Sequence, residues 1–547
     1  MIHAIPAIGW HFISMLAILI VFYSILKKFL QELVSPIALF SISWFWGYAI
    51  LNTLVLVPGF NKIFFTIPTN MLRFLSIVTI VTAIFRLSMS RKYYLSLIFS
   101  LLLLYPLSFL LTTSTDDNLG LHSSIGSLHT GKYVYFAEYL KLCTELPKVR
   151  HNLAQSNFAA VISHISGSNT ALSLMGVLVF SKVAIASFIY YLSHSIVGLK
   201  RSLSFIVMLV TTAGSFSLSM AHLLVHDSGN PLILNGYSDV IFGIFVMLFV
   251  CTLFASEEFK FLWKSLILLV PLNVTLLIGS PQVFLLIAGL SILFILVKQW
   301  RNIAAINMLS IVIALLIWRN STGILATGVV NVFEFLPKTT YEWFSGELIS
   351  PGIPYMIGSP GMQSSEINPK VIDVFKFLLS ETDVQRMVWH FEIAIWLILK
   401  VLFWPLLGLL LGFLLNVSTK FREKVGLEDK SYQVLRKNGL IAVFSFVLLF
   451  PITFFLKLGE MKWETTRFAF PAYVLLMFIM SATLLKINQQ NRLMPIAIGL
   501  LGLLPTLIFV GLAMKYSIQA GLITSSSSEF GVFSLFGKTI DNIWCQG

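Results

Sequence analysis

The stretch Phe261–Arg301, FLWKSLILLVPLNVTLLIGSPQVFLLIAGLSILFILVKQWR, decides the fold. It contains two apolar runs, 261–279 and 281–298, with a short uncharged link between them. Each run has the length of roughly 20 residues that an α-helix needs to cross the hydrocarbon core of a bilayer. The basic residues Lys298 and Arg301 follow the second run. We therefore expect a hairpin of two membrane-spanning helices, with the link on one side of the membrane and the basic end on the other.

The rest of the chain repeats this pattern. Of its 547 residues, 57% are hydrophobic and 11% are charged, and the mean hydropathy is +0.88, whereas soluble domains carry about 25% charged residues. These values predict an all-α integral membrane protein without a soluble domain of ordinary size. About fourteen transmembrane helices are expected, at 9–26, 35–57, 71–87, 93–112, 170–193, 203–221, 238–255, 261–279, 281–298, 303–318, 390–416, 438–457, 468–486 and 493–513.

The basic residues of the connections predict the orientation. They concentrate in alternate short loops, at Lys27 and Lys28, at Arg91 and Lys92, at Lys200 and Arg201, at Lys298 and Arg301, and in the run 420–437. Short basic loops stay in the cytoplasm, so we expect the long loops 113–169 and 319–389, and both termini, outside. The formal net charge of +13 then reflects orientation and attraction to anionic lipids, and no nucleic-acid partner is expected. The predicted location is a bacterial cytoplasmic (inner) membrane, and a eukaryotic endomembrane stays open.

The first long outer loop begins with two adjacent carboxylates, Asp116 and Asp117, where an apolar span ends. They stand out because the chain has only 24 acidic residues. Two amphipathic segments follow, 133–145 and 154–165, with apolar residues at helical spacing. We expect these juxtamembrane helices to lie along the outer surface of the membrane and to hold the carboxylates near the headgroups. The alternative is that the carboxylates belong to a solvated turn or a helix N-cap.

The other outer connections differ in composition. Residues 346–361 of the second long loop are rich in glycine and proline, which is typical of an extended, mobile loop. A helix is expected to resume at Asn368-Pro369. The third connection, 457–471, carries five charges within eleven residues, and the last of these charges, Arg467, lies at a helix start. It is either part of a binding site or an anchor at the membrane interface.

These features together resemble the GT-C superfamily of lipid-linked glycosyltransferases. The resemblance rests on the acidic outer loop with its surface helices and on a late Arg-x-x-x-Pro-x-Tyr segment, formed by Arg467, Pro471 and Tyr473. It covers roughly residues 93–513. The acidic loop follows the fourth span here and the first span in the family, so residues 1–92 are interpreted as an added N-terminal block of three helices. Residues 514–547 form an outer tail.

The resemblance implies a sugar donor on a polyprenyl phosphate and an acceptor that is an envelope glycan, lipid or protein. Asp117 or Asp116 would remove the proton of the acceptor hydroxyl. Two cations, Arg467 and Lys462, would stabilise the leaving phosphate. Weaker candidates for the same site are His122, Arg150 and His151.

No cofactor is predicted, although a divalent metal ion stays possible. His222 and His226, followed by Asp227, have the spacing of a metal pair, but no further ligands are near them in sequence. Cys143 and Cys545 are both expected outside, where they can pair if they meet.

Three other functions fit parts of the sequence. A flippase or transporter would place charges or broken helices at the membrane midplane, whereas the polar residues here gather in outer loops. An O-antigen polymerase or ligase would carry arginines within its large outer loop, but the loop 319–389 has only Arg319 and Arg386, both near its ends. A noncatalytic membrane subunit is the third alternative. The prediction is therefore a GT-C-type membrane glycosyltransferase that acts at the outer face.

Overall fold

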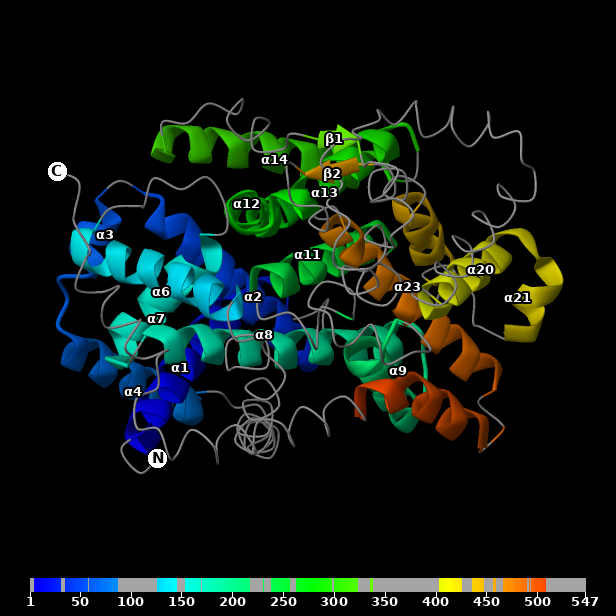
Figure 1. The fold of residues 1–547 in the computed structure, drawn as a ribbon, viewed down its shortest axis with the longest axis horizontal. Coiled ribbons are helices and arrows are strands. Elements are labelled where there is room, and N and C mark those ends of the chain that lie inside the picture. The colour runs from blue at the N-terminus through cyan, green and yellow to red at the C-terminus, as the bar shows by residue number, and fades with distance from the viewer. Residues whose placement is uncertain are drawn as a thin grey trace, which may run out of the picture.

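The structure is a computed structural model that describes residues 4–30, 35–57, 59–86, 125–144, 153–168, 170–216, 230, 238–255, 262–297, 300–322, 335–337, 403–425, 435–446, 456–458, 466–488, 491 and 493–507. Within these ranges the regular elements are helices and one pair of short strands (Figure 1). The predicted all-helical architecture is therefore confirmed.

Five helices of the described part of the chain are long and apolar enough to cross a membrane. They are α1 (Ala4–Leu30), α2 (Pro36–Val55), α8 (Thr170–Tyr191), α14 (Arg301–Thr322) and α23 (Thr466–Ile487). Shorter apolar helices accompany them, namely α4 (Thr69–Arg86), α9 (Arg201–Ala213), α11 (Ser238–Ala255), α12 (Leu262–Gly279), α13 (Pro281–Ile295), α20 (Phe403–Val417) and a helix at 493–507. Every predicted span contains a described helix except 93–112, which lies outside the described residues. The total of fourteen spans stays a prediction.

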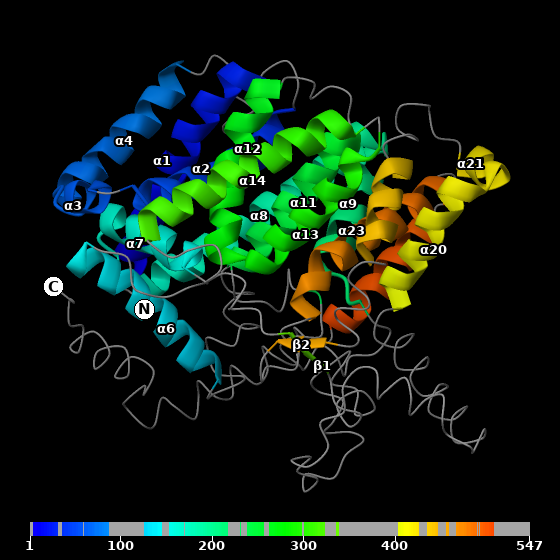
Figure 2. The ribbon, with the colours of Figure 1, turned by 90° about the horizontal axis from the view of Figure 1, so that it is seen from above.

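The remaining elements lie toward the ends of this bundle. They are α3 (Phe60–Phe64), α6 (Ile125–Cys143), α7 (Ala154–Ser166), a π-helical turn η2 (Leu192–Ile196), α21 (Thr419–Val425), a helix at 435–446, and the strands β1 (Phe335–Pro337) and β2 (Leu456–Leu458). Figure 2 shows α6, β1 and β2 along one edge of the molecule and α21 at the opposite edge. The first edge carries the segments that the sequence places outside.

Two consecutive, contacting helices are present where the hairpin was predicted, and their crossing of a membrane stays a prediction. α12 ends at Gly279 and α13 begins at Pro281, a residue suited to a first helical turn because it needs no backbone N–H partner there. Ser280, the single residue between them, donates its hydroxyl to the carbonyl oxygen of Asp239 at 2.6 Å. The link is thereby fixed to the start of α11.

The centre of the bundle is an aromatic cluster between α2, α8 and α11. The ring of Phe45 stacks on Phe245 at 4.1 Å between centroids, and Phe188 meets the same ring edge-on at 5.2 Å. Trp44 packs against Phe180 of α8 at 4.8 Å and donates its indole N–H to Ser181 at 3.1 Å. Such offset and edge-on pairs add to the stabilisation by buried area, and the hydrogen bond satisfies the buried indole. These contacts set the spacing of the three helices.

α7 differs from the prediction. The amphipathic pattern indicated a helix that lies on the membrane surface, but every residue from Ala154 to Ser163 is buried. α7 packs against α1, α6 and α8, and its Phe158 lies 4.6 Å from the ring of Tyr48 in α2. Residues 154–163 are therefore buried on all sides of the helix, and their polar side chains lie inside the protein. The pattern identified the helix but not the neighbours that cover its polar side.

A short antiparallel ribbon joins two distant parts of the chain. β1 pairs with β2, with Phe335 opposite Leu458 and Pro337 opposite Leu456. Residues 456 and 457, the last two of the predicted span 438–457, belong to β2. Residues 447–455 lie outside the described part of the chain, so the length of the helix that begins at 435 stays a prediction. A short apolar run does not distinguish a strand from the end of a helix by periodicity.

Glycines allow α20 to approach its neighbours closely. A Cβ atom at Gly408 would collide with the carbonyl oxygen of Leu476 in α23. One turn later, a Cβ atom at Gly412 would lie 3.4 Å from the Cα atom of Gly439. Small residues four apart bring helix backbones together in membrane proteins, where van der Waals packing drives association. α20 and α23 lie side by side in both ribbon views (Figures 1 and 2).

Candidate functional site

Most of the predicted site residues lie outside the described part of the chain. This holds for Asp116, Asp117, His122, Arg150, His151 and Lys462, and also for His222, His226 and Asp227. Arg467 is described in its backbone only, as the second residue of α23. The assignments made from the sequence therefore stay predictions.

The cysteines separate into two environments. Cys143, the last residue of α6, is disulfide-bonded. Cys251 is free and buried within α11. The remaining cysteine of the sequence, Cys545, lies outside the described residues. Because disulfides persist in oxidising compartments, the bonded state of Cys143 favours an extracytoplasmic position for the end of α6.

The β1–β2 ribbon brings together two connections that were predicted independently. β1 belongs to the second long outer loop, and β2 begins the charged third connection, which continues to Arg467 at the start of α23. The ribbon therefore places part of the second loop beside the charged connection. Three-residue strands carry too little periodicity to be recognised in a sequence.

An arginine fixes the C-terminal end of α7. Arg73 of α4 donates from Nε and Nη2 to the carbonyl oxygen of Ser166, at 2.9 and 2.5 Å. Its guanidinium also lies 4.9 Å from the ring centroid of Trp10 in α1. The carbonyl groups at a helix C-terminus favour a cation, because they carry the negative end of the helix dipole. Gly167 caps the helix with a φ of 60°, and a Cβ atom there would lie 2.5 Å from Arg73.

A second cluster of polar side chains joins α6 to α7 and α8. Lys141 of α6 donates to Glu138 at 3.1 Å and to Ser163 of α7 at 3.0 Å. Thr170, the first residue of α8, donates its hydroxyl to the same Glu138 carboxylate. The hydroxyl of Ser163 donates to the carbonyl oxygen of Ser168 at 2.8 Å. Both charged groups have partners, so this cluster holds α6 against α7 and α8.

His164 connects α7 to the turn before α4. Its Nε2 atom lies 3.0 Å from the carbonyl oxygen of Ile67 and donates to it, and its ring packs edge-on against Phe64 and Phe65. Burial lowers the pKa of His164 from its ordinary value of 6.5, and the positive charge of Lys141 acts in the same direction, whereas the hydrogen bond to Ile67 opposes the shift. The folded protein therefore favours the neutral ring.

A pH dependence of stability follows from His164. Below about pH 6.5 the unfolded chain binds a proton at this ring while the folded chain does not, so stability decreases as the pH falls toward the lower folded pKa. Between about pH 7 and pH 5, we expect the thermal unfolding midpoint of the detergent-solubilised native chain to decrease more steeply than that of His164→Asn. Equal slopes for the two chains would contradict this role.

A buried carboxylate that the sequence analysis did not select lies where α2, α7, α11 and the α12–α13 link meet. Asp239, in the first turn of α11, is 3% exposed and accepts a hydrogen bond from the hydroxyl of Tyr48 at 2.5 Å. The backbone N–H of Gln155, in the first turn of α7, also donates to this carboxylate. α7 has no side-chain cap of its own, so Asp239 caps it from a neighbouring helix. A charged residue at the start of an apolar span is a signal that could have found it.

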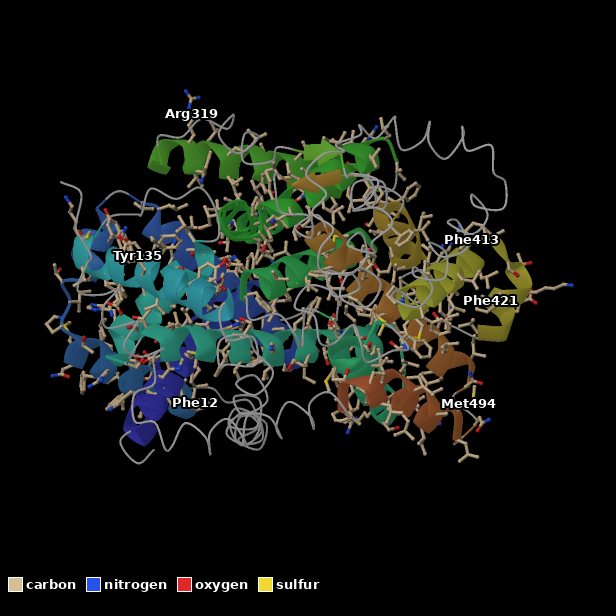
Figure 3. All side chains as sticks on the ribbon, viewed as in Figure 1. Phe12, Tyr135, Arg319, Phe413, Phe421 and Met494 are labelled. Atoms are coloured by element: carbon tan, nitrogen blue, oxygen red, sulfur yellow. The ribbon has the colours of Figure 1, made fainter. Side chains whose placement is uncertain are left out.

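Arg319, one of the two arginines noted at the ends of the loop 319–389, takes no part in these clusters. It is exposed near the end of α14 and projects away from the bundle (Figure 3). Within the described ranges, no group of three or more histidine, cysteine, aspartate or glutamate residues is placed to hold a metal ion.

Comparisons with known proteins add no assignment. No family model, curated protein or solved structure matches the chain. A functional interpretation therefore rests on the residues themselves and on their arrangement.

Proposed function

We propose that this chain is an integral membrane glycosyltransferase of GT-C type. It would transfer a sugar from a polyprenyl-phosphate donor to a glycan, lipid or protein acceptor at the outer face of a bacterial cytoplasmic membrane. The long apolar tail of the donor would stay in the bilayer, while the phosphate and sugar reach the outer edge of the bundle.

The observation that carries the proposal is the β1–β2 ribbon. It joins the second outer loop to the charged connection that ends at Arg467. A reaction at a membrane surface needs the donor and the acceptor side by side at that surface. The ribbon between the two loops, close in sequence to the start of α23, would supply a place to hold both. The anchoring of α7 by Arg73 and of α6 by Lys141 supports the same assignment for the first loop.

The start of α23 suits the leaving phosphate. Arg467 lies in the first turn, where unpaired N–H groups and the positive end of the helix dipole favour an anion. Pro471 lies four residues later in the same helix and has no N–H, so the carbonyl oxygen of Arg467 lacks its usual helical partner. The proposed roles are phosphate stabilisation for Arg467 and Lys462, and general base for Asp117 or Asp116.

A transporter is the second candidate, because polar side chains also lie inside the bundle. Asn273 of α12 donates to Asn307 and Ser310 of α14 at 3.1 and 2.6 Å, and Asn307 donates to Ser291 of α13 at 2.8 Å. All four residues are buried. Such networks join helices in membranes, and they also line transport paths. Vesicle flux of a lipid-linked sugar without sugar transfer would favour this candidate.

The proposal is tested by sugar transfer in reconstituted vesicles with a panel of polyprenyl-phosphate sugars. Arg467→Ala is expected to lower transfer by about 10²–10³-fold, the usual loss when a donor to a developing negative charge is removed. Lys486→Ala, in the last turn of the same helix, is the matched control and is expected to retain activity. If the native chain consumes no donor, the glycosyltransferase proposal is wrong, and equal activity of the two variants removes Arg467 from the site.

A further inference from the structure

The end of α6, where Cys143 lies, is fixed to the rest of the protein by α7. Leu140 is 0% exposed and packs in a cluster with Val161 of α7. The Nζ atom of Lys141 donates to a hydroxyl group of α7 at 3.0 Å. Directly after Cys143 the helix ends, because Thr144 has a left-handed φ of 54°, which is rare for a β-branched residue. Cys143 therefore has a fixed position, and any group that bonds to it must come to the end of α6.

Cys143 is disulfide-bonded, and the sequence offers few partners for it. The chain has three cysteines, Cys143, Cys251 and Cys545. Cys251 is free and only 1% exposed, inside the apolar helix α11. The structure contains a single chain, so the partner of Cys143 is a cysteine of the same chain. With Cys251 free, Cys545 is the cysteine that is left.

We infer that a disulfide bond between Cys143 and Cys545 joins the C-terminal tail of the chain to the end of α6. Cys545 lies outside the described residues, so its assignment rests on the states of Cys143 and Cys251 and on the number of cysteines. The Cα atoms of a bridged pair lie about 4.4–6.8 Å apart, so the bond brings the end of the chain to the first outer loop. This inference is independent of the proposed glycosyltransferase activity, because it needs no substrate.

Formation of the bond removes two electrons and two protons from the two thiols. The oxidant is the disulfide of a thiol–disulfide oxidoreductase, which forms a mixed disulfide with one cysteine of this chain and is released with two thiols when the second cysteine attacks. Such oxidants act outside the cytoplasm, in compartments where disulfides persist. Cys251 stays reduced, because thiol exchange requires an accessible thiolate and this thiol is buried among apolar side chains.

The bond constrains the topology of the membrane spans. Both cysteines must lie on the same, oxidising side of the membrane, so the chain crosses the membrane an even number of times between them. Ten of the spans that the sequence predicts lie between residues 143 and 545, from 170–193 to 493–513. This even number agrees with the prediction that the first long loop and the C-terminal tail are both outside.

The first test counts the thiols of the full chain after expression in bacterial membranes. The protein is denatured and labelled with a maleimide-linked polyethylene glycol, which adds a fixed mass for each free thiol. We expect one labelled thiol, that of Cys251, before reduction and three after it. Cys545→Ser should show two labelled thiols both before and after reduction. Cys251→Ala is the matched control and should show none before reduction and two after it.

Two further measurements identify the bond. A peptide map of the unreduced native chain should contain a linked pair of peptides, with Cys143 in one and Cys545 in the other, that dithiothreitol separates. Cys143→Ser and Cys545→Ser should each lower the thermal unfolding midpoint by several degrees, because the bond restricts the unfolded chain over a long loop. The double variant should unfold at the midpoint of either single variant, because both changes remove the same bond.

Several outcomes would overturn the inference. These are three free thiols in the native chain before reduction, a dimer of two chains that dithiothreitol separates, a Cys143 peptide linked to Cys251, and additive losses of stability in the double variant. The thiol count and the peptide map use the native chain, so they decide the question even if a serine variant folds poorly.

Discussion

Replacement of the proposed general base, Asp117 or Asp116, by asparagine is expected to lower sugar transfer by about 10²–10⁴-fold, the usual contribution of a general base. Asparagine keeps the size and hydrogen bonding of the side chain but does not accept the proton of the acceptor hydroxyl. One of the two variants, Asp116→Asn or Asp117→Asn, should show this loss with little change in the apparent affinity for the donor. The other should retain most of the activity.

Transfer in reconstituted vesicles measures this loss, and thermal unfolding of each variant confirms that it folds. Glu423→Gln is the matched control, because Glu423 is an exposed carboxylate in α21 at the opposite edge of the molecule (Figure 2). If the native chain is active and both aspartate variants keep full activity, the base lies elsewhere. If Glu423→Gln loses as much activity as either, the effect is one of general stability.

Gly408→Ala is expected to separate α20 from α23 and to lower the free energy of unfolding by about 3 kcal/mol. The added methyl group would meet the carbonyl oxygen of Leu476, which belongs to the backbone of α23 and has no rotamer that gives way. The whole of α20 must therefore move. The loss should appear as a lower thermal midpoint and a lower yield of monodisperse protein in detergent.

Gly289→Ala provides the comparison for Gly408→Ala. Gly289 also lies inside an apolar helix, α13, but an added Cβ atom there would have no neighbour within 4 Å. Because alanine is the better helix former, this variant should unfold at the native midpoint or slightly above it. Equal midpoints for the two variants would show that close approach at Gly408 does not stabilise the bundle.

The sequence predicted the helices well because membrane spans have a simple requirement. A run such as 281–298 must satisfy its backbone hydrogen bonds internally, so apolar length alone indicates a helix. α7 was harder, since its amphipathic pattern does not reveal that α1, α6 and α8 cover its polar side. Strand β2 was missed for a related reason, because its partner β1 lies in another loop.

The candidate site was less predictable than the fold. The prediction selected carboxylates by their place in a loop, and Asp116 and Asp117 lie outside the described residues. Asp239 was passed over because it is a single charge at the edge of an apolar run. Its importance arises from Tyr48, Gln155 and Gly279, which are distant in sequence and meet it only in the folded chain.

The ribbon between β1 and β2 also affects how this protein can change in evolution. It closes a long excursion of the chain, 338–455, at its base. For residues added as flexible loop, the entropy of closure grows only with the logarithm of the loop length, so that each doubling costs about 0.6 kcal/mol. Insertions between β1 and α20 should therefore cost little stability. For the proposed glycosyltransferase, we therefore expect the length of this connection to vary with the acceptor while the helices stay unchanged.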